Sequence, residues 1–239
     1  PVHELPELKW KDTGHHISQN IPFAPEEKII SVEILPNNSE PTGTILFVSK
    51  EGYIKQTLMS DFRTFRGYRN KKAVAMKLKS ETDLIVSIQR LEDQQNYDVL
   101  LVTHFGFSLR YAVNEVGIIG TRASGVKSIN LKDGDVVVGG AAFKEGDEEF
   151  PVLVVTQRGN IKKFKSGEVP ILGREKRGLM LLKELKAKPH RIIFMDCDLS
   201  LPNRYAIRTT AGTSIVAESK EIPFSPRYSN GSFAINEKT

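Results

Sequence analysis

Lysine and arginine are the residues of this sequence whose spacing most plainly indicates chemistry. Residues 50–79 hold nine bases against two acids, and residues 158–191 hold eleven bases against three acids. The sign reverses between them, with five acids against one base in 81–98 and six acids against two bases in 132–149. Clustered cations neutralise phosphate groups, so the alternation predicts a polyanion-binding surface on which bases are separated from acids.

Candidate catalytic or metal-binding groups are few and poorly arranged. Residues 120–128 resemble a phosphate-binding loop, but Val126 separates the second glycine from Lys127 and no helical pattern follows. His15 and His16 are adjacent, so on a strand they would point to opposite faces. No Ser-His-Asp or Cys-His pattern supplies a nucleophile with a base. We therefore expect no catalytic residue, no metal site, no cofactor and no small-molecule substrate in this chain.

Two repeated glycine patterns must position the bases. The first is a β-branched run, a turn that ends in glycine, and an apolar–basic stretch; its glycines are Gly52, Gly106, Gly159 and Gly212, spaced by 54, 53 and 53 residues. The second follows at a nearly constant distance, and its glycines, Gly125, Gly178 and Gly231, are 53 residues apart. Alternating apolar residues on both sides of a turn glycine predict β-hairpins.

A repeat of about 53 residues built from strands predicts an all-β fold. Four-stranded units of this length are typical of a propeller-like ring, here of about five blades, and a linear solenoid is the alternative. The chain holds about 4.5 repeats, so an open or broken ring is one expected outcome. The predicted single domain over 1–239 divides roughly into a partial repeat at 1–41 and repeats at 42–96, 97–150, 151–202 and 203–239.

Composition is that of an ordinary folded chain. The 239 residues are 39% hydrophobic, carry a net charge of +5, and include one cysteine, Cys197. This excludes a disulfide framework and a cysteine-rich zinc module. The longest weakly polar run is too short for a membrane helix, and no secretory signal opens the chain. We expect a cytoplasmic protein.

Two stretches resemble the C-terminal domain of bacterial type IIA topoisomerase A subunits. In residues 52–78 and 114–138, a basic loop and a glycine followed by apolar residues succeed the hairpin pattern. The opening, 1–23, is similar to topoisomerase IV of Gram-positive bacteria more than to gyrase. The gyrase heptapeptide Q-R-R-G-G-K-G does not occur, and neither the catalytic tyrosine of the family nor its preceding arginine has a match.

The resemblance implies a β-pinwheel, a propeller-like disc whose blades exchange a strand and whose basic outer rim binds and bends duplex DNA. It implies a non-catalytic part of an ATP-dependent type II DNA topoisomerase that relaxes and decatenates DNA during chromosome segregation. The partners it implies are double-stranded DNA, a second copy of the same polypeptide in a homodimer, and the ATPase B subunit, with ATP and Mg²⁺ bound elsewhere in the enzyme. It implies work at the nucleoid, with peripheral membrane association left open.

Two alternatives from other classes stay open at this point. One is a protein-interaction propeller that docks an acidic partner or subunit. The other is an enzyme with its site at the propeller centre, where the sequence places valine, isoleucine and leucine.

The candidate DNA contacts are bases at matching places of the repeats. They are expected to neutralise phosphates without reading base edges. The loop candidates are Arg63, Arg66, Arg69, Lys71, Lys72, Arg122, Lys127, Arg174, Lys176, Arg177 and Arg227. The hairpin candidates, which would extend the strip, are Lys55, Arg110, Lys162 and Lys163.

Overall fold

The computed structural model describes residues 6–19, 21, 24–34, 41–62, 73–197 and 203–234. Within these ranges the regular structure is β-strand and short 3₁₀ turn, and no helix is long and apolar enough to cross a membrane. The strands are β1 (Thr44–Ser49), β2 (Tyr53–Leu58), β3 (Ile85–Leu91), β4 (Tyr97–Thr103), β5 (Phe107–Ala112), β6 (Val126–Lys127), β7 (Val137–Lys144), β8 (Pro151–Thr156), β9 (Asn160–Lys165), β10 (Leu179–Met180), β11 (Ile192–Asp196), β12 (Arg204–Arg208), β13 (Ser214–Glu218) and β14 (Ser232–Phe233). The 3₁₀ turns are η2 (Ile17–Gln19), η3 (Met59–Phe62), η4 (Val113–Glu115), η5 (Ser166–Glu168) and η6 (Ser219–Glu221).

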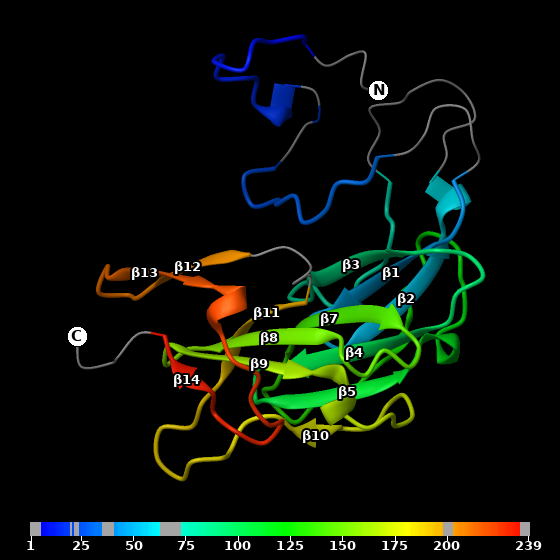
Figure 1. Cartoon of the computed structure of the whole chain (residues 1–239). Coiled ribbons are helices and arrows are strands. Elements are labelled where there is room, and N and C mark those ends of the chain that lie inside the picture. The colour runs from blue at the N-terminus through cyan, green and yellow to red at the C-terminus, as the bar shows by residue number, and fades with distance from the viewer. Residues whose placement is uncertain are drawn as a thin grey trace.

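Three four-stranded antiparallel sheets and one hairpin follow one another along the chain (Figure 1). The first sheet has the order β3-β1-β2-β6, the second β10-β5-β4-β7 and the third β11-β8-β9-β14; the hairpin is β12-β13. Each sheet is built on a hairpin whose turn carries one of the predicted glycines, and Gly52, Gly106 and Gly159 have φ of 83°, 88° and 78°. The predicted all-β fold with four-stranded units is confirmed.

One edge strand of each sheet, which we call the exchanged strand, belongs to the following repeat. β6 pairs with β2, β10 with β5 and β14 with β9, so each sheet is completed by residues that lie more than sixty positions beyond its hairpin. Sequence-neighbouring sheets are therefore linked through shared backbone hydrogen bonds as well as through side-chain packing. This is the strand exchange that the β-pinwheel resemblance implies.

The core lies between the sheets and uses both faces of the central one. Along β4, Val99 and Leu101 pack in one cluster with Leu46 of the first sheet. The alternate residues Leu100 and Val102 pack in a second cluster that includes β8 of the third sheet. Successive residues of a strand point to opposite faces, so a continuous apolar run suits a strand covered on both sides.

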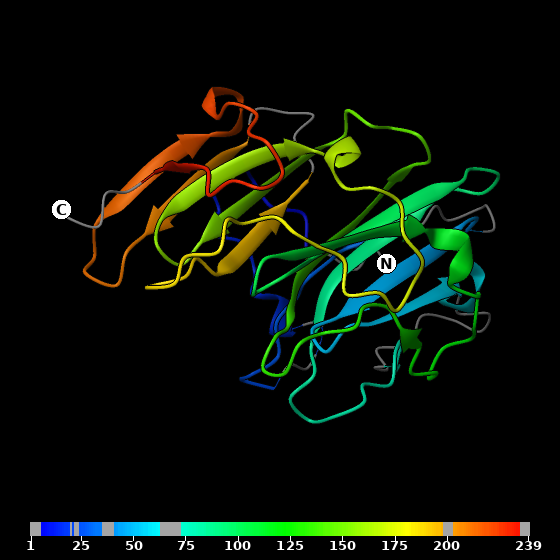
Figure 2. The same ribbon diagram turned by 90° about the horizontal axis from the view of Figure 1, so that it is seen from below.

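The sheets form an open arc. The first sheet and the β12–β13 hairpin lie at opposite ends of the arrangement in both views, and no strand pairing joins them in the described residues (Figures 1 and 2). The described residues form three four-stranded sheets and a two-stranded hairpin, and the count of about five blades for the whole chain stays a prediction. The division into repeats, and the single domain over 1–239, stay a prediction.

Residues 24–34 contain no strand, although their apolar pattern matches the later β3 and β7 segments. The glycine hairpin that supplies partner strands in later repeats has no counterpart in residues 1–23 of the sequence. The apolar side chains Ile30, Val32 and Ile34 of this segment are exposed.

Candidate nucleic-acid interface

Three equivalent loops run along the outer edge of the three sheets, and we call them the rim loops: residues 118–127, 171–180 and 224–233. Each begins with a backbone hydrogen bond to the second strand of the preceding hairpin (β2, β5 or β9). Each ends in the exchanged strand (β6, β10 or β14). The bonds run from Ile119 N to Gln56 O at 2.9 Å, from Leu172 N to Arg110 O at 2.8 Å and from Ser225 N to Lys163 O at 2.8 Å. The donors are spaced by 53 residues, so the structure repeats the loop anchor with the sequence period.

Four of the predicted contact residues are exposed on the first two rim loops. They are Arg122 and Lys127 on the first loop and Lys176 and Arg177 on the second. Arg122 has φ of 69°, a left-handed conformation in which its loop turns sharply. The second and third rim loops occupy positions equivalent to the first, so the cations recur along one edge of the arc. Such an edge can neutralise several phosphates of one polyanion.

Arg174 and Arg227 are half-buried and fasten the rim loops. The backbone N–H of Arg174 donates to the Glu115 carboxylate at 2.8 Å, and that of Arg227 donates to the Glu168 carboxylate. Each guanidinium then donates to a carbonyl of its neighbouring exchanged strand, Arg174 to Lys127 O and Arg227 to Met180 O, both at 2.5 Å. These two arginines hold the loops in shape while part of each side chain faces solvent.

The four hairpin bases are not available for phosphate contact, which corrects the prediction for Lys55, Arg110, Lys162 and Lys163. Their side chains are buried, at 0%, 1%, 1% and 9% exposure. A phosphate oxygen cannot reach a cation that is enclosed and already donates its hydrogens to protein acceptors. Charge alone pointed to these residues, and a sequence does not show which acceptors enclose a charge.

One set of hairpin side chains ties each hairpin to the next 3₁₀ turn. Arg110 donates to Ser166 O at 3.3 Å in η5, and Lys163 donates to Ser219 O at 2.8 Å in η6. At the equivalent place in the first repeat, Gln56 donates to Val113 O at 3.2 Å in η4. The acceptors are spaced by 53 residues, so this fastener repeats with the fold. The sequence signal that locates it is the fourth position after each turn glycine, and the charge pattern does not mark Gln56 because it is neutral.

Arg110 also forms the most buried ion pair of the described structure. Its guanidinium donates to Asp98 at 2.7 and 3.0 Å and to both Glu148 carboxylate oxygens at 3.0 Å. The hydrogen bonds from Arg110 hold the pKa of Glu148 below its usual value. Removing one partner would leave a charge buried without compensation, which costs about 3–5 kcal/mol in comparable cases. The arginine therefore stabilises the fold between the second and third sheets.

A second set of hairpin lysines anchors loop segments. Lys55 Nζ donates to Ala75 O at 2.5 Å, and the equivalent lysine two repeats further on, Lys162, donates through Nζ to Leu181 O at 2.7 Å. Lys162 also donates to Ser229 O at 3.1 Å and to Arg227 O. Burial, with a smaller contribution from Arg227, lowers the pKa of Lys162 to about 8. All three N–H groups of this ammonium have an acceptor, and two of those acceptors belong to the third rim loop.

The remaining loop candidates lie outside the described residues. These are Arg63, Arg66, Arg69, Lys71 and Lys72. Their proposed DNA contacts stay a prediction.

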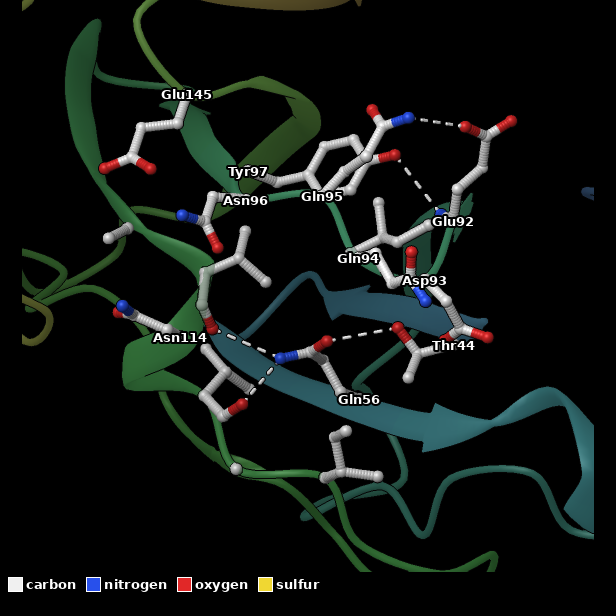
Figure 3. Close-up of a pocket in the computed structure, with 16 residues that line it drawn as sticks. Thr44, Gln56, Glu92, Asp93, Gln94, Gln95, Asn96, Tyr97, Asn114 and Glu145 are labelled. Atoms are coloured by element: carbon white, nitrogen blue, oxygen red, sulfur yellow. Dashed lines mark hydrogen bonds between the residues drawn. The ribbon is translucent and has the colours of Figure 1, made fainter. Parts of the chain in front are cut away.

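Acidic side chains gather in a pocket of about 360 Å³ between the first two sheets (Figure 3). Glu92, Asp93 and Glu145 line it, and no lysine, arginine or histidine is among its described lining residues. On its floor, Gln56 accepts from the Thr44 hydroxyl at 3.1 Å and donates to Val113 O of η4 at 3.2 Å and to Val116 O at 2.6 Å. A DNA backbone would be repelled here, so the pocket bounds the surface that a polyanion can use.

Potential metal ligands do not converge in the part of the chain that the structure describes. No three His, Cys, Asp or Glu side chains there are placed to hold a metal ion. The surface chemistry that recurs is that of exposed cations on a β scaffold.

The family follows from comparison with known proteins. The chain belongs to the DNA gyrase C-terminal domain, beta-propeller family, whose model matches residues 43–92, 97–144 and 151–197. Within that family it is similar to the A subunits of topoisomerase IV. It is 36% identical over 239 residues to the DNA topoisomerase 4 A subunit of Bacillus subtilis, covering 100% of this chain and 28% of that protein. It is also 36% identical over 248 residues to the same subunit of Streptococcus pneumoniae, covering 98% of this chain and 29% of that protein.

Solved structures agree with this placement. The C-terminal domain of DNA topoisomerase IV superposes with a TM-score of 0.86 at 38% identity, covering 100% of this chain and 71% of that one. The DNA gyrase A C-terminal domain shares the fold, with a TM-score of 0.71 at 18% identity over 95% of this chain and 71% of that one. The predicted resemblance to topoisomerase IV is confirmed. The chain spans less than a third of the curated relatives it matches.

Proposed function

We propose that this chain is a non-catalytic module that binds and bends duplex DNA for a type II topoisomerase of the topoisomerase IV kind. In the longer protein it would present DNA segments for strand passage, relaxation and decatenation at the nucleoid. A second copy of the longer protein and the ATPase B subunit would be its protein partners, while ATP and Mg²⁺ would act elsewhere in the enzyme. The observation that carries the proposal is the exposed cations of equivalent rim loops along one edge of the arc.

The energetics favour several contacts spread along that edge. Bending a 20–30 bp segment costs on the order of 1–6 kcal/mol, and no single exposed ion pair offsets such a cost. Arg122, Lys127, Lys176 and Arg177 lie on loops that the fold repeats, so one duplex can meet them in succession. Backbone amides of the loops can add hydrogen bonds to phosphate oxygens. Binding should therefore be largely independent of base sequence.

The test is the salt dependence of duplex binding. In the variant Arg122→Gln, Lys127→Gln, Lys176→Gln, Arg177→Gln, the slope of log affinity against log salt should become shallower by about 0.9 for each phosphate that is no longer neutralised. The matched control is Lys9→Gln, Lys11→Gln, Lys28→Gln, Lys144→Gln, which removes the same charge from exposed positions off the rim loops. An equal change in the control, or no duplex binding by the unmodified chain at low salt, would contradict the proposal.

A further inference from the structure

We infer that a basic hollow beside Arg177 holds a backbone phosphate of the duplex, with Lys132 and Arg191 as its ligands. The hollow measures about 480 Å³ and is lined by the three cations together with Phe105, Phe107 and Met180. This inference rests on the proposed function and extends it to two residues that the repeat pattern does not mark. Neither Lys132 nor Arg191 belongs to a rim loop.

Backbone contacts bring the three cations together from separate segments. Met180 of the exchanged strand β10 pairs with Phe107 of β5, which sets the second rim loop against the β4–β5 hairpin. Ile192 N donates to His104 O at 2.9 Å, and so the preceding Arg191 lies beside the hairpin turn. Asp135 accepts from Phe105 N at 2.8 Å, and Asp135 N donates to Lys132 O at 3.0 Å, which places the Lys132 turn on the other side.

Aromatic rings hold two of the cations in place. Lys132 Nζ lies 4.8 Å from the centroid of the Phe107 ring, and Arg191 Cζ lies 4.8 Å from that of Phe105. Arg191 also donates to His190 O at 2.8 Å. A cation that is held before the ligand arrives loses less side-chain entropy on binding. The rings therefore preorganise the charge of the hollow.

The charge and shape of the hollow fit a phosphate. Three cations face one lining carboxylate, Glu184, which lies 3.7 Å from Arg191. Cations in a recess with apolar walls focus positive potential, and lysine with arginine is the pair of side chains that phosphate recognition favours. Phe107 is buried with a cation over its ring, so it offers no face on which a base could stack. Arg177 joins the hollow to the second rim loop, so a duplex on that loop can place a phosphate here.

The experiment uses a double variant, Lys132→Gln with Arg191→Gln, which we call the hollow variant. Its binding to a labelled 30 bp duplex is compared with that of the unmodified full chain across a salt series. We expect affinity to fall and the slope of log affinity against log salt to become shallower by about 0.9, because one phosphate is no longer neutralised. The control Lys144→Gln, Arg208→Gln removes one lysine and one arginine charge from exposed strand positions outside the hollow. Calorimetric titration of inorganic tripolyphosphate into the unmodified chain and into the hollow variant measures whether the hollow binds a free anion. Comparison with duplex binding then distinguishes a free anion from a DNA phosphate.

Each outcome is decisive. A slope change in the hollow variant that the control lacks supports the inference. An unchanged duplex slope overturns it, and if tripolyphosphate binding disappears at the same time, the hollow is a site for free anions instead. If the unmodified chain binds no duplex at all, the proposed function fails. If the unmodified chain binds duplex, and the Lys132/Arg191 double variant shows the same salt slope as the Lys144/Arg208 control, the proposed function stands without the hollow.

Discussion

Lys162 and Lys163 illustrate how a basic residue on a strand can serve the interior. Both are buried although they are neighbours on β9, because acceptors cover each face of the strand. Their acceptors lie 19 to 67 residues away for Lys162 and 56 residues away for Lys163. A single sequence shows where a charge occurs but not which carbonyls converge on it. The same charge pattern predicted the loop candidates. Of these, Arg122, Lys127, Lys176 and Arg177 are exposed, and their DNA contacts stay a prediction.

The buried ammonium of Lys162 predicts a pH-dependent stability. Its pKa is lowered from 10.5 to about 8, so between these values the unfolded chain retains a proton that the native chain has released. The free energy of unfolding of the unmodified protein, measured relative to that of Lys162→Met, should therefore increase as pH rises through this window. The increase should be at most about 1.4 kcal/mol per pH unit. Urea unfolding of both chains at several pH values from 7 to 10 measures it.

Two features make that experiment informative. The methionine keeps most of the length of the side chain and removes the titrating group, so the difference between the two chains isolates the ammonium. Lys144→Met, an exposed substitution on β7, controls for the removal of a lysine. The prediction is contradicted if the free energy of unfolding of the unmodified protein, relative to that of Lys162→Met, stays constant or decreases from pH 7 to pH 10.

Among the elements, the exchanged strands depend on glycine where they meet the preceding sheet. Gly125, Gly178 and Gly231 have φ of 78°, 80° and 68°, and a Cβ on any of them would lie within 2.4 Å of a carbonyl oxygen on the adjacent hairpin strand, β2, β5 or β9. The second glycine pattern in the sequence thus marks the places where two repeats approach most closely. The 53-residue period of this glycine pattern was visible in the sequence. That each glycine borders a strand exchanged between repeats was implied by the family resemblance alone.

A single methyl group at Gly178 should weaken the link between the second and third repeats. In Gly178→Ala the Cβ would meet Ser108 O at 2.0 Å, in addition to the left-handed backbone strain. Gly146→Ala is the matched control, since Gly146 has φ of 79° and open space around the new Cβ. We expect the free energy of unfolding to fall by about 1–2 kcal/mol for Gly146→Ala from the backbone conformation, and by a further amount of roughly 1–3 kcal/mol for Gly178→Ala.

Chemical denaturation of both alanine variants, with an unmodified reference, gives the comparison. Decreases of equal size would show that the backbone of β10 moves away from β5 without cost, and would contradict a strand exchange that stabilises the arc. The control also separates the two causes, because both variants share the positive φ and only one has the contact.

The segment that precedes the first sheet shows how far a side-chain pattern alone can predict a strand. Residues 24–34 carry the apolar alternation of a strand, but a strand forms only when a partner satisfies its backbone groups. The pattern of side chains therefore predicts a capacity to pair, and the presence of a neighbour decides whether pairing occurs. The period of 53 residues predicts about 4.5 repeats in a ring that can stay open, and the described residues complete three four-stranded sheets of it.

At the scale of the whole molecule, the arc separates two kinds of surface. Cations on the rim loops lie on the outer edge, where exchanged strands end each sheet, while Glu92, Asp93 and Glu145 line a pocket without basic residues among those described. The buried cations link the sheets inside and contribute to rigidity instead of binding. A stiff, curved edge of positive charge favours a bent polyanion over a straight one, since the curvature is set before the ligand arrives.

An open arc also sets how far DNA can follow it, and that leads to a prediction about topology. A duplex guided by three sheets and a hairpin should bend without completing a turn around the chain. We expect the unmodified chain to increase the ring-closure rate of a duplex of about 200 bp, which is only slightly longer than the persistence length of about 150 bp and therefore resists bending. Ligation of nicked circles in its presence should shift the linking number by much less than one per bound chain. An unchanged closure rate would contradict bending, and a shift near one per chain would mean that the DNA wraps a path longer than the described arc. The quadruple rim variant Arg122→Gln, Lys127→Gln, Lys176→Gln, Arg177→Gln should abolish both effects together, because in the proposed function the same cations would bind the duplex and impose its curvature.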